Sequence, residues 1–453
     1  MAKKSKKIIR KILIVPDYIF LVFFLPCLLL GSLFSIPWIL KQRGTWKSNC
    51  ERSPKALILR AFTVEKLTSR GYESLLPFRN PSIKWLAFLD PANSVATEIE
   101  ITKDLFIMTW ELPAIVRFMK KIRFLATAII FRELIAIFRI ADYCVKEHIG
   151  VLRVYKHDYP ALQAYLVSCL IKIPFIVDIM GNFELIRRLS GKVYYFRELN
   201  RIPFIKVFAR IATNWLLGLP LRHASLVLGR NKNNYEHAFA LRAPVDRLSL
   251  LRINNFSATF NAYNPEKQPA KQAEYPYLLF VGRLVEYKYP LDALAAFDLV
   301  APHIPEYRLV IIGDGAIRHE VQQTKESSEY RDRIILLGAC SNDIVFNWTA
   351  HAQVAICPYS GSTLVEAMLC GIPVIAYDIE WHPEIVIDDY TGFLVPFRNI
   401  SALAEKIIEV VRNHEEAKIV AMRGRELARV AFDKEKIQEK ESMYYRMALA
   451  DSR

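Results

Sequence analysis

The feature that most constrains this chain is the regular alternation of short apolar runs with amphipathic stretches between residues 277 and 376. The apolar runs predict strands at 277–281, 309–312, 334–337, 354–357 and 374–376. The stretches between them predict helices that begin near residues 290, 317, 343 and 363. Strands that alternate with helices in this way indicate βαβ units, so the sequence predicts a doubly wound domain with a parallel sheet.

The first part of the chain follows the same pattern less regularly. Strands are expected at 56–59, 85–89, 105–108, 151–155 and 175–179, with a helix at 161–171. Residues 264–276 are polar and contain prolines, which places a linker between two domains there. The predicted fold class is α/β, with an N-terminal segment at 1–54, Rossmann-like domains at 55–262 and 263–432, and a last helix at 433–453 that packs back on the first domain.

An uncharged stretch of 23 residues, 18–40, lies near the start of the chain. At ~1.5 Å per helical residue it is long enough to cross a hydrocarbon core of ~30 Å, so it predicts a membrane segment. Basic residues flank both ends, and Pro26 lies within the stretch. A kinked segment that re-enters on one side and a straight single span both stay open. We expect a membrane-associated protein whose two domains lie on the cytoplasmic face.

The net charge of +15 arises mostly near that stretch, because the first 60 residues hold twelve basic and two acidic side chains. This concentration favours an anionic lipid surface and argues against nucleic acid as a partner. Basic amphipathic patterns at 113–144 and 202–221 fit either membrane contact or ordinary helices that cover a sheet. The seven cysteines are scattered and show no metal-binding spacing, so they predict reduced thiols.

Two cations follow the first strand of the regular half. Gly282 lets the backbone turn at the strand exit, and Arg283 and Lys288 lie in the loop behind it. A planar guanidinium and an ammonium five residues apart can converge on a diphosphate. A solvated loop with ordinary surface charges is the alternative that these residues alone leave open.

A loop of small residues leads into the helix expected near residue 363. Gly361, Ser362 and Thr363 can offer backbone and hydroxyl donors to a phosphate at the helix start, where the helix dipole favours an anion. Glu366 lies one turn further on, where its carboxylate can accept hydrogen bonds from ribose hydroxyls. Thr363 and Glu366 also fit a capping box, which would explain both without a ligand. Gly313, after the second strand, by itself indicates only a tight turn.

In order and spacing these pieces resemble the donor-binding half of glycosyltransferase family four, the retaining enzymes of GT-B architecture. The resemblance is clear over residues 277–396 and fainter in the first domain. It implies parallel sheets that face each other across a cleft, and a nucleoside-diphosphate sugar as donor. It also implies that Arg283 and Lys288 bind the donor pyrophosphate and that Glu366 binds the ribose. The donor-binding residues that it implies are Gly282, Gly313, Gly361, Ser362, Thr363 and Leu364.

The chain departs from the family pattern at three places. Pro358 stands where the family has the earlier of two glutamates eight positions apart. Glu380 and Trp381, followed by His382, replace a glycine pair, and Met180 replaces a frequent histidine. Trp381 and His382 could contact the donor sugar or anchor a buried loop. The identity of the sugar therefore stays open at this point.

The resemblance implies transfer with retention at the anomeric carbon, and cationic stabilisation of the departing diphosphate. No cofactor or metal is expected, because no Asp-x-Asp ends a strand and Arg283 with Lys288 could replace a divalent ion. His157 follows a strand that is expected to face the cleft, so it is the candidate that would serve the acceptor hydroxyl.

The predicted function is that of a membrane-associated retaining glycosyltransferase in cell-surface polysaccharide or glycolipid assembly. Its predicted partners are a nucleotide sugar donor, a glycan or lipid-linked acceptor and membrane lipids, with no nucleic acid. The alternative is a catalytically inactive GT-B scaffold at the membrane, and the proline at 358 is the main argument for it.

Overall fold

The computed structural model describes residues 55–59, 83, 85–92, 98–111, 125–190, 214–252, 260, 263 and 271–451. They form two compact units. The first unit runs to Arg187 and continues from Gly191 to Leu251, and it also takes the end of the chain from Glu435. The second unit takes Arg188–Ser190 and Arg252–Lys434. The main division thus falls between residues 251 and 252, where the sequence predicted it between 262 and 263.

The apolar segment at 18–40 lies outside the described residues, so its predicted membrane role stays a prediction. No helix that the structure describes is both long and apolar enough to cross a membrane.

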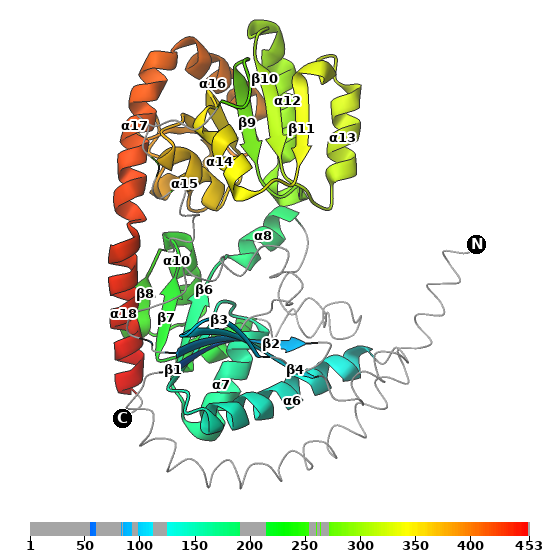
Figure 1. Cartoon of the computed structure of the whole chain (residues 1–453). Coiled ribbons are helices and arrows are strands. Elements are labelled where there is room, and N and C mark those ends of the chain that lie inside the picture. The colour runs from blue at the N-terminus through cyan, green and yellow to red at the C-terminus, as the bar shows by residue number, and fades with distance from the viewer. Residues whose placement is uncertain are drawn as a thin grey trace, which may run out of the picture. The chain divides into compact units, whose positions relative to one another are not determined.

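An eight-stranded sheet forms the centre of the first unit (Figure 1). Its spatial order is β3-β4-β2-β1-β5-β6-β7-β8. The strands are β1 (Lys55–Leu59), β2 (Trp85–Ala92), β3 (Glu98–Thr102), β4 (Leu105–Glu111), β5 (Val151–Val154), β6 (Phe175–Ile179), β7 (Leu226–Gly229) and β8 (Leu248–Leu250). The predicted strands at 56–59, 85–89, 105–108, 151–155 and 175–179 correspond to β1, β2, β4, β5 and β6, whereas β3, β7 and β8 were not predicted.

One strand corrects the prediction of a parallel first sheet. β3 pairs antiparallel with β4, while every other pair of neighbours in this sheet is parallel. Only Lys103 and Asp104 separate the two strands, and so short a connection permits an antiparallel hairpin but no crossover. The hydroxyl of Thr102 donates a hydrogen bond of 2.7 Å to the Asp104 carboxylate and steadies this turn.

Helices cover both faces of the first sheet. They are α6 (Leu125–Lys146), α7 (Tyr159–Ile171), α10 (Lys232–Ala240) and α18 (Lys434–Asp451), while α8 (Phe183–Ser190) follows β6 and a short 3-10 turn, η3 (Val245–Arg247), precedes β8. Leu57 and Leu59 enter the core with α6, α7 and α10, whereas Ala56 and Ile58 enter the core with α18. Because alternate residues of β1 are buried in two cores, one on each face of the sheet, its sequence is a continuous apolar run.

In the basic amphipathic stretches at 113–144 and 202–221, apolar side chains pack in the core of the first unit. In α6, Ile140, Ala141 and Cys144 are fully buried in the core, and near the second stretch Leu217 and Leu221 join the same core. Sheet-covering helices, the alternative to membrane contact, therefore account for the described parts of both stretches. Residues 113–124 and 202–213 lie outside the described ranges.

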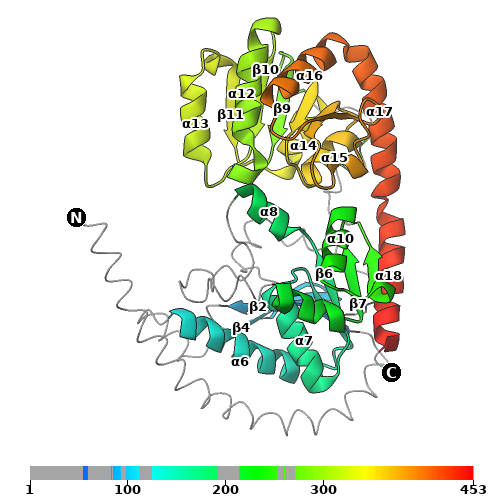
Figure 2. The ribbon, with the colours of Figure 1, turned by 180° about the vertical axis from the view of Figure 1, so that it is seen from behind.

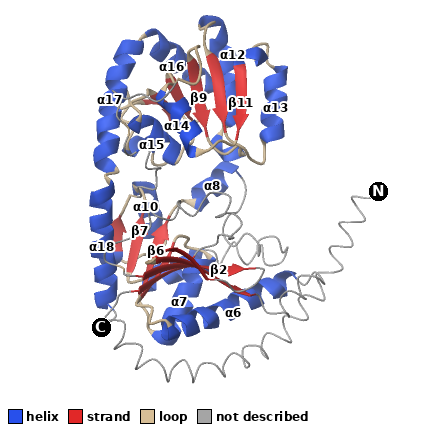
Figure 3. Ribbon diagram, in the orientation of Figure 1, coloured by secondary structure: helices blue, strands red, loops and turns tan. Residues whose placement is uncertain are grey.

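The second unit contains a six-stranded parallel sheet (Figure 3). Its order is β11-β10-β9-β12-β13-β14. The strands are β9 (Tyr277–Val281), β10 (Arg308–Ile312), β11 (Ile334–Gly338), β12 (Val354–Cys357), β13 (Val374–Tyr377) and β14 (Phe393–Val395). The chain adds β10 and β11 on one side of β9 and then returns to add β12 on the other. The strand order reverses between β9 and β12, which is where doubly wound sheets hold ligands, beyond the carboxyl ends of the strands.

Helices flank this sheet on both faces, as Figures 1 and 2 show from opposite sides. They are α12 (Pro290–Val300), α13 (Arg318–Ser327), α14 (Asn342–Ala350), α15 (Ser362–Leu369), α16 (Ile400–Arg412) and α17 (His414–Ala431), with 3-10 turns η4 (Glu286–Lys288), η5 (Ala301–His303), η6 (Arg331–Arg333) and η7 (His382–Glu384). Residues of α12, α13 and α16 share one core with the sheet, and residues of α14 and α15 share the other. The regular half of the sequence thus folds as its pattern predicted.

Candidate functional site

The loop after β9 brings the two predicted cations together. The Nη2 atom of Arg283 donates a hydrogen bond of 2.6 Å to the hydroxyl of Tyr287. The ring of the same tyrosine lies 5.9 Å from the guanidinium carbon of Arg283 and 5.9 Å from the Nζ atom of Lys288. The two cations therefore flank one aromatic ring at the switch point of the sheet, as a shared anion would require.

Lys288 also reaches the loop that follows β12. Its Nζ atom lies 4.9 Å from the ring centre of Tyr359, a buried residue directly after Pro358. Burial, followed by the positive charge of Arg283, lowers the pKa of Lys288 to about 8, while the carboxylate of Glu380 opposes that shift. An anion at this point would relieve both the desolvation and the repulsion between the cations.

The start of α15 lacks a side-chain cap. Gly361 is the N-cap residue, and no side chain accepts a hydrogen bond from the first turn. The capping box of Thr363 and Glu366 is therefore not formed, because the helix begins two residues earlier than that box requires. A β-carbon added at Gly361 would meet no heavy atom within 4 Å. The helix start thus opens onto space that a phosphate or a sugar could occupy.

Glu366 lies one turn into α15 in an apolar setting. Burial raises the pKa of its carboxyl to about 7, and a hydrogen bond from Ser362 acts in the opposite direction. The thiol of Cys357, at the end of β12, interacts electrostatically with both Lys288 and Glu366, and burial raises its own pKa to about 12. Cys357 is thus a neutral thiol between the cation and the carboxylate, and it is not available as a thiolate nucleophile.

Of the predicted glycines after β9 and β10, Gly313 has a structural reason to be glycine. Gly313 has a φ of +146°, and a β-carbon there would lie 1.8 Å from the carbonyl oxygen of Gly282. Its N–H donates to the carbonyl of Gly338 at 2.8 Å, and the N–H of Gly282 donates to that of Ile312 at 3.0 Å. This close approach fixes the β9 and β10 loops against each other, and a role for either glycine toward a donor stays a prediction.

Leu364 and Thr363, the remaining predicted donor-binding residues, belong to the first turn of α15. The side chain of Leu364 is fully buried in the core, and its N–H donates to the carbonyl of Gly361 at 3.3 Å. A ligand could therefore meet only the backbone of Leu364.

His382 anchors a loop, one of the two roles that the sequence left open for it. The imidazole is fully buried, and its Nδ1 atom lies 2.9 Å from the carbonyl oxygen of Tyr377. Its Nε2 atom accepts a hydrogen bond of 3.1 Å from the N–H of Ser360. Burial lowers the pKa of His382 to about 4, so the ring is neutral at physiological pH. Trp381 packs beside it, partly buried against the core.

Sequence reasoning missed two side chains at this place. The hydroxyl of Tyr359 donates a hydrogen bond to the carboxylate of Glu380. Tyr287, as described above, links Arg283 with Lys288. The only signal in the sequence was that Tyr359 and Glu380 stand in the two segments that depart from the family pattern.

His157 belongs to the first unit and not to this group. Its side chain is 1% exposed, and its ring lies 5.4 Å from that of His237. Burial, followed by the charge of His237, lowers its pKa to about 3. As the residue stands, it could serve an acceptor hydroxyl only after becoming open to solvent, so its catalytic role stays a prediction.

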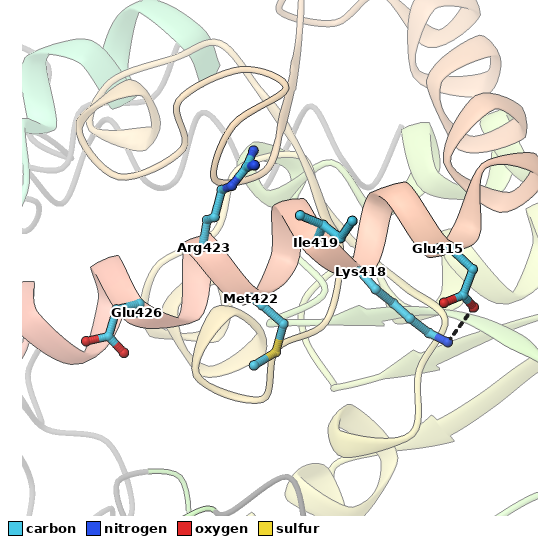
Figure 4. Close-up of a pocket in the computed structure, with 6 residues that line it drawn as sticks. All are labelled: Glu415, Lys418, Ile419, Met422, Arg423 and Glu426. Atoms are coloured by element: carbon cyan, nitrogen blue, oxygen red, sulfur yellow. Dashed lines mark hydrogen bonds and ion pairs between the residues drawn. The ribbon is translucent and has the colours of Figure 1, made fainter.

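The second unit also has surface hollows, one of them away from this group of residues and one beside it. One of about 560 Å³ runs along α17 and is lined by side chains of that helix alone (Figure 4), namely Glu415, Lys418, Ile419, Met422, Arg423 and Glu426. Another of about 260 Å³ adjoins the Lys288 turn and includes Tyr287. Neither contains Glu366 or Gly361. Among the residues that the structure describes, no three metal-ligating side chains gather, and the need for a metal stays untested.

Three comparisons with known proteins bear on this site. Residues 264–427 match the family model of glycosyl transferases group 1. The chain is 25% identical over 245 residues to EpsD of Bacillus subtilis, which is named as a glycosyltransferase, across 51% of this chain and 64% of EpsD. It is 26% identical over 215 residues to the gpi3 subunit of phosphatidylinositol N-acetylglucosaminyltransferase of Schizosaccharomyces pombe, across 46% of each protein. The chain thus spans less than two thirds of either relative.

A solved structure extends the likeness to the fold of both units. HepE of Anabaena in complex with UDP covers 86% of this chain and 98% of its own length, with a TM-score of 0.59 and 14% identity. At that identity the likeness shows the fold alone. The predicted resemblance is therefore confirmed: residues 264–427 are similar to the group 1 glycosyl transferases, and the chain shares the fold of HepE.

Proposed function

We propose that this chain is a membrane-associated retaining glycosyltransferase that moves a sugar from a nucleoside-diphosphate sugar to a glycan or lipid-linked acceptor. The observation that carries the proposal is that Arg283 and Lys288 flank the ring of Tyr287 beside the switch point of the second sheet. Lys288 also lies over the ring of Tyr359, two residues before the uncapped start of α15. Two cations and a helix dipole that converge in this way suit a pyrophosphate. Glu366, one turn away, suits the ribose hydroxyls.

The proposed chemistry needs little beyond positioning and charge. The bond between the anomeric carbon and the donor phosphate breaks, and its electron pair leaves with the nucleoside diphosphate. The acceptor hydroxyl forms the new bond on the same face of the sugar, and its proton goes to the departing phosphate. Arg283 and Lys288 stabilise the negative charge that develops on the leaving group.

Relatives support the choice of substrates. HepE, of similar fold, is solved with UDP, which makes UDP the first nucleotide to test. The gpi3 relative carries phosphatidylinositol in its printed name, which supports a lipid-linked acceptor here. The uncharged stretch at 18–40 and the basic residues beside it support a location at an anionic membrane, with the two units on the cytoplasmic face.

The test begins with thermal unfolding of the full chain in the presence of UDP, GDP, ADP or CMP. A nucleotide at roughly 100 times its dissociation constant adds ~2.7 kcal/mol to the free energy of unfolding, so the base that fits will raise the melting temperature visibly. Sugar transfer and donor hydrolysis are then measured with the matching nucleotide sugars.

Variants decide whether the site performs the reaction. Arg283→Ala and Lys288→Ala should each lower turnover by about 100-fold, because each removes a charge from the leaving group. Lys418→Ala is the matched control, since this lysine lies on α17 and pairs with Glu415 at 2.9 Å. Wild-type turnover in both site variants would contradict the proposal. Nucleotide binding without transfer or hydrolysis would instead favour the inactive scaffold, for which the proline at 358 argues.

A further inference from the structure

The loops that leave β12 and β13 run side by side at the carboxyl edge of the second sheet. The two strands are parallel neighbours, with Cys357 paired to Ala376 at their ends. Residues that follow these ends therefore emerge at the same level of the sheet. The β12 loop carries Pro358 and leads to Gly361, and the β13 loop carries Glu380.

Side-chain contacts hold the two loops together. The hydroxyl of Tyr359 donates to the carboxylate of Glu380, and the imidazole of His382 accepts from the N–H of Ser360 at 3.1 Å. Glu380 is thereby fixed against the loop that opens onto the empty space at Gly361.

The carboxylate of Glu380 lies close enough to Lys288 to act on its charge. Its charge acts on Lys288, whose Nζ atom lies over the ring of the same Tyr359 that binds Glu380. A donor whose pyrophosphate meets Lys288 would carry its sugar next to that pyrophosphate. A carboxylate can accept about four hydrogen bonds, so the group that binds the Tyr359 hydroxyl is chemically suited to bind the hydroxyls of a sugar as well.

The backbone of Glu380 is in a conformation that a glutamate adopts only at a cost. Its φ is +53°, in the left-handed region that favours glycine. Strain of this kind persists where the surrounding structure enforces it, and it concentrates at functional sites. The cost is consistent with a side chain that is needed at this position.

We propose that Glu380 recognises the donor sugar by accepting hydrogen bonds from its hydroxyls, in place of the carboxylate that the proline at 358 cannot provide. This inference rests on the proposed function, because it presupposes a nucleotide sugar whose pyrophosphate lies between Arg283 and Lys288.

The test compares a nucleotide with its sugar conjugate. Dissociation constants are measured by calorimetry at pH 7.5 for UDP and UDP-glucose, GDP and GDP-mannose, and ADP and ADP-glucose. For the full wild-type chain, one conjugate should bind more tightly than its nucleotide. Glu380→Gln should weaken that conjugate about tenfold, since a carboxylate that binds hydroxyls is lost, and leave the nucleotide within about threefold.

The Gln variant keeps an oxygen for the Tyr359 hydroxyl, so it separates sugar recognition from loop anchoring. Tyr359→Phe removes the anchor and keeps the carboxylate, and it should weaken the conjugate less than Glu380→Gln does. Asp389→Asn is the matched control. Asp389 is also an acidic residue with positive φ, at +55°, and it pairs with Lys406 at 3.4 Å, so this change should leave both constants unchanged.

The outcomes separate the two proposals. If a wild-type nucleotide sugar binds and turns over while Glu380→Gln matches the wild type for the conjugate, the role of Glu380 is refuted and the proposed function stands. An equal loss for nucleotide and conjugate would also refute it, because a general disturbance of the site would then explain the change. If the wild-type chain binds none of the three nucleotides or their sugars, both proposals fall.

Discussion

At the scale of the residue, the site contains two groups, a carboxyl and an amine, whose pKa values are shifted toward neutral pH. Glu366 has a pKa raised to about 7 by burial, and Lys288 has a pKa lowered to about 8 by burial and by Arg283. Besides Arg283, the charged groups that act on Lys288 include Glu380, which opposes the shift. The active form needs Glu366 ionised to accept from ribose and Lys288 protonated to hold the pyrophosphate.

We therefore predict that kcat/KM for the donor follows a narrow bell, with an acid limb near pH 7 and an alkaline limb near pH 8. This quantity reports the free enzyme, so the pKa values of the empty site apply. Glu366→Gln should remove the acid limb, and Lys288→Arg should move the alkaline limb upward, because an arginine keeps its proton. An alkaline limb that Lys288→Arg leaves in place would assign it to another group.

The same raised pKa of Glu366 affects stability, with a definite sign. Between pH 4.5 and about 7 the folded chain holds the proton of Glu366 more tightly than the unfolded chain does. Its contribution to the free energy of unfolding is therefore complete below pH 4.5 and is lost as pH rises through about 7. Glu366→Gln should flatten this part of the stability profile, as denaturant unfolding at pH 5 and pH 7.5 would show.

The sequence predicted those site residues whose position follows from the pattern of a single short segment. Arg283, Lys288 and Glu366 each follow a strand or begin a helix within one run of residues, so the strand pattern alone brought them to one edge of the sheet. Tyr359 and Glu380 meet 21 residues apart, across two loops whose backbone path depends on a positive φ. A local sequence pattern does not predict that path, because secondary-structure propensity concerns residues that are adjacent in the sequence and not loops that meet in space.

At the scale of the element, the same limit explains the strands that were missed. β7 has four residues and β8 has three, too short for a periodicity to be read from them. β3 carries glutamates at two alternate positions and lies at the edge of the sheet, so it lacks the apolar run by which buried strands are recognised. In the second sheet, by contrast, the apolar runs predicted β9 to β13, whereas β14, with three residues at the edge of the sheet, was also missed.

His382 controls the position of the β12 loop and hence the start of α15. His382→Ala should lower the melting temperature and weaken nucleotide binding, because the buried N–H of Ser360 loses its acceptor at a cost of about 1–3 kcal/mol. His303→Ala, at an exposed histidine in η5, is the control. The measurement is thermal unfolding with and without the nucleotide that binds the wild type.

The stabilising effect of His382 also depends on pH. Its pKa is lowered to about 4 in the folded chain from an ordinary value of 6.5. The contribution is therefore present above pH 6.5 and is lost as pH falls through about 4. The difference in the free energy of unfolding between wild type and His382→Ala should shrink from pH 7 to pH 4.5. A difference that stays constant would mean that the imidazole acts through packing alone.

At the scale of the whole molecule, the chain returns at its end to the unit in which it began. The last helix, α18, packs on the first sheet through Tyr444, Tyr445 and Ala448. Beneath it, Arg153 of β5 is 1% exposed and donates to Asp178 of β6 at 2.7 Å. This arginine also donates to the hydroxyl of Tyr445 at 2.8 Å and pairs with Glu441 at 2.6 Å.

These contacts lay beyond sequence prediction for a plain reason. Arg153 stands inside an apolar strand, and one of its partners is 292 residues further along the chain. A buried guanidinium is tolerated only when charges and hydrogen bonds compensate it, so the last helix completes the first unit chemically as well as sterically.

The stability of the first unit should therefore depend on one face of α18 and not on the other. Tyr445→Ala removes a fully buried ring and a partner of Arg153, so it should lower the free energy of unfolding by about 3–5 kcal/mol. Tyr445→Phe keeps the ring and loses only the hydroxyl, which should cost about 1 kcal/mol. Met447→Ala, on the same helix with its side chain 48% exposed, should change little. Denaturant unfolding of the full chain measures all three, and equal losses for Tyr445→Ala and Met447→Ala would mean that α18 does not pack on the sheet as the structure shows.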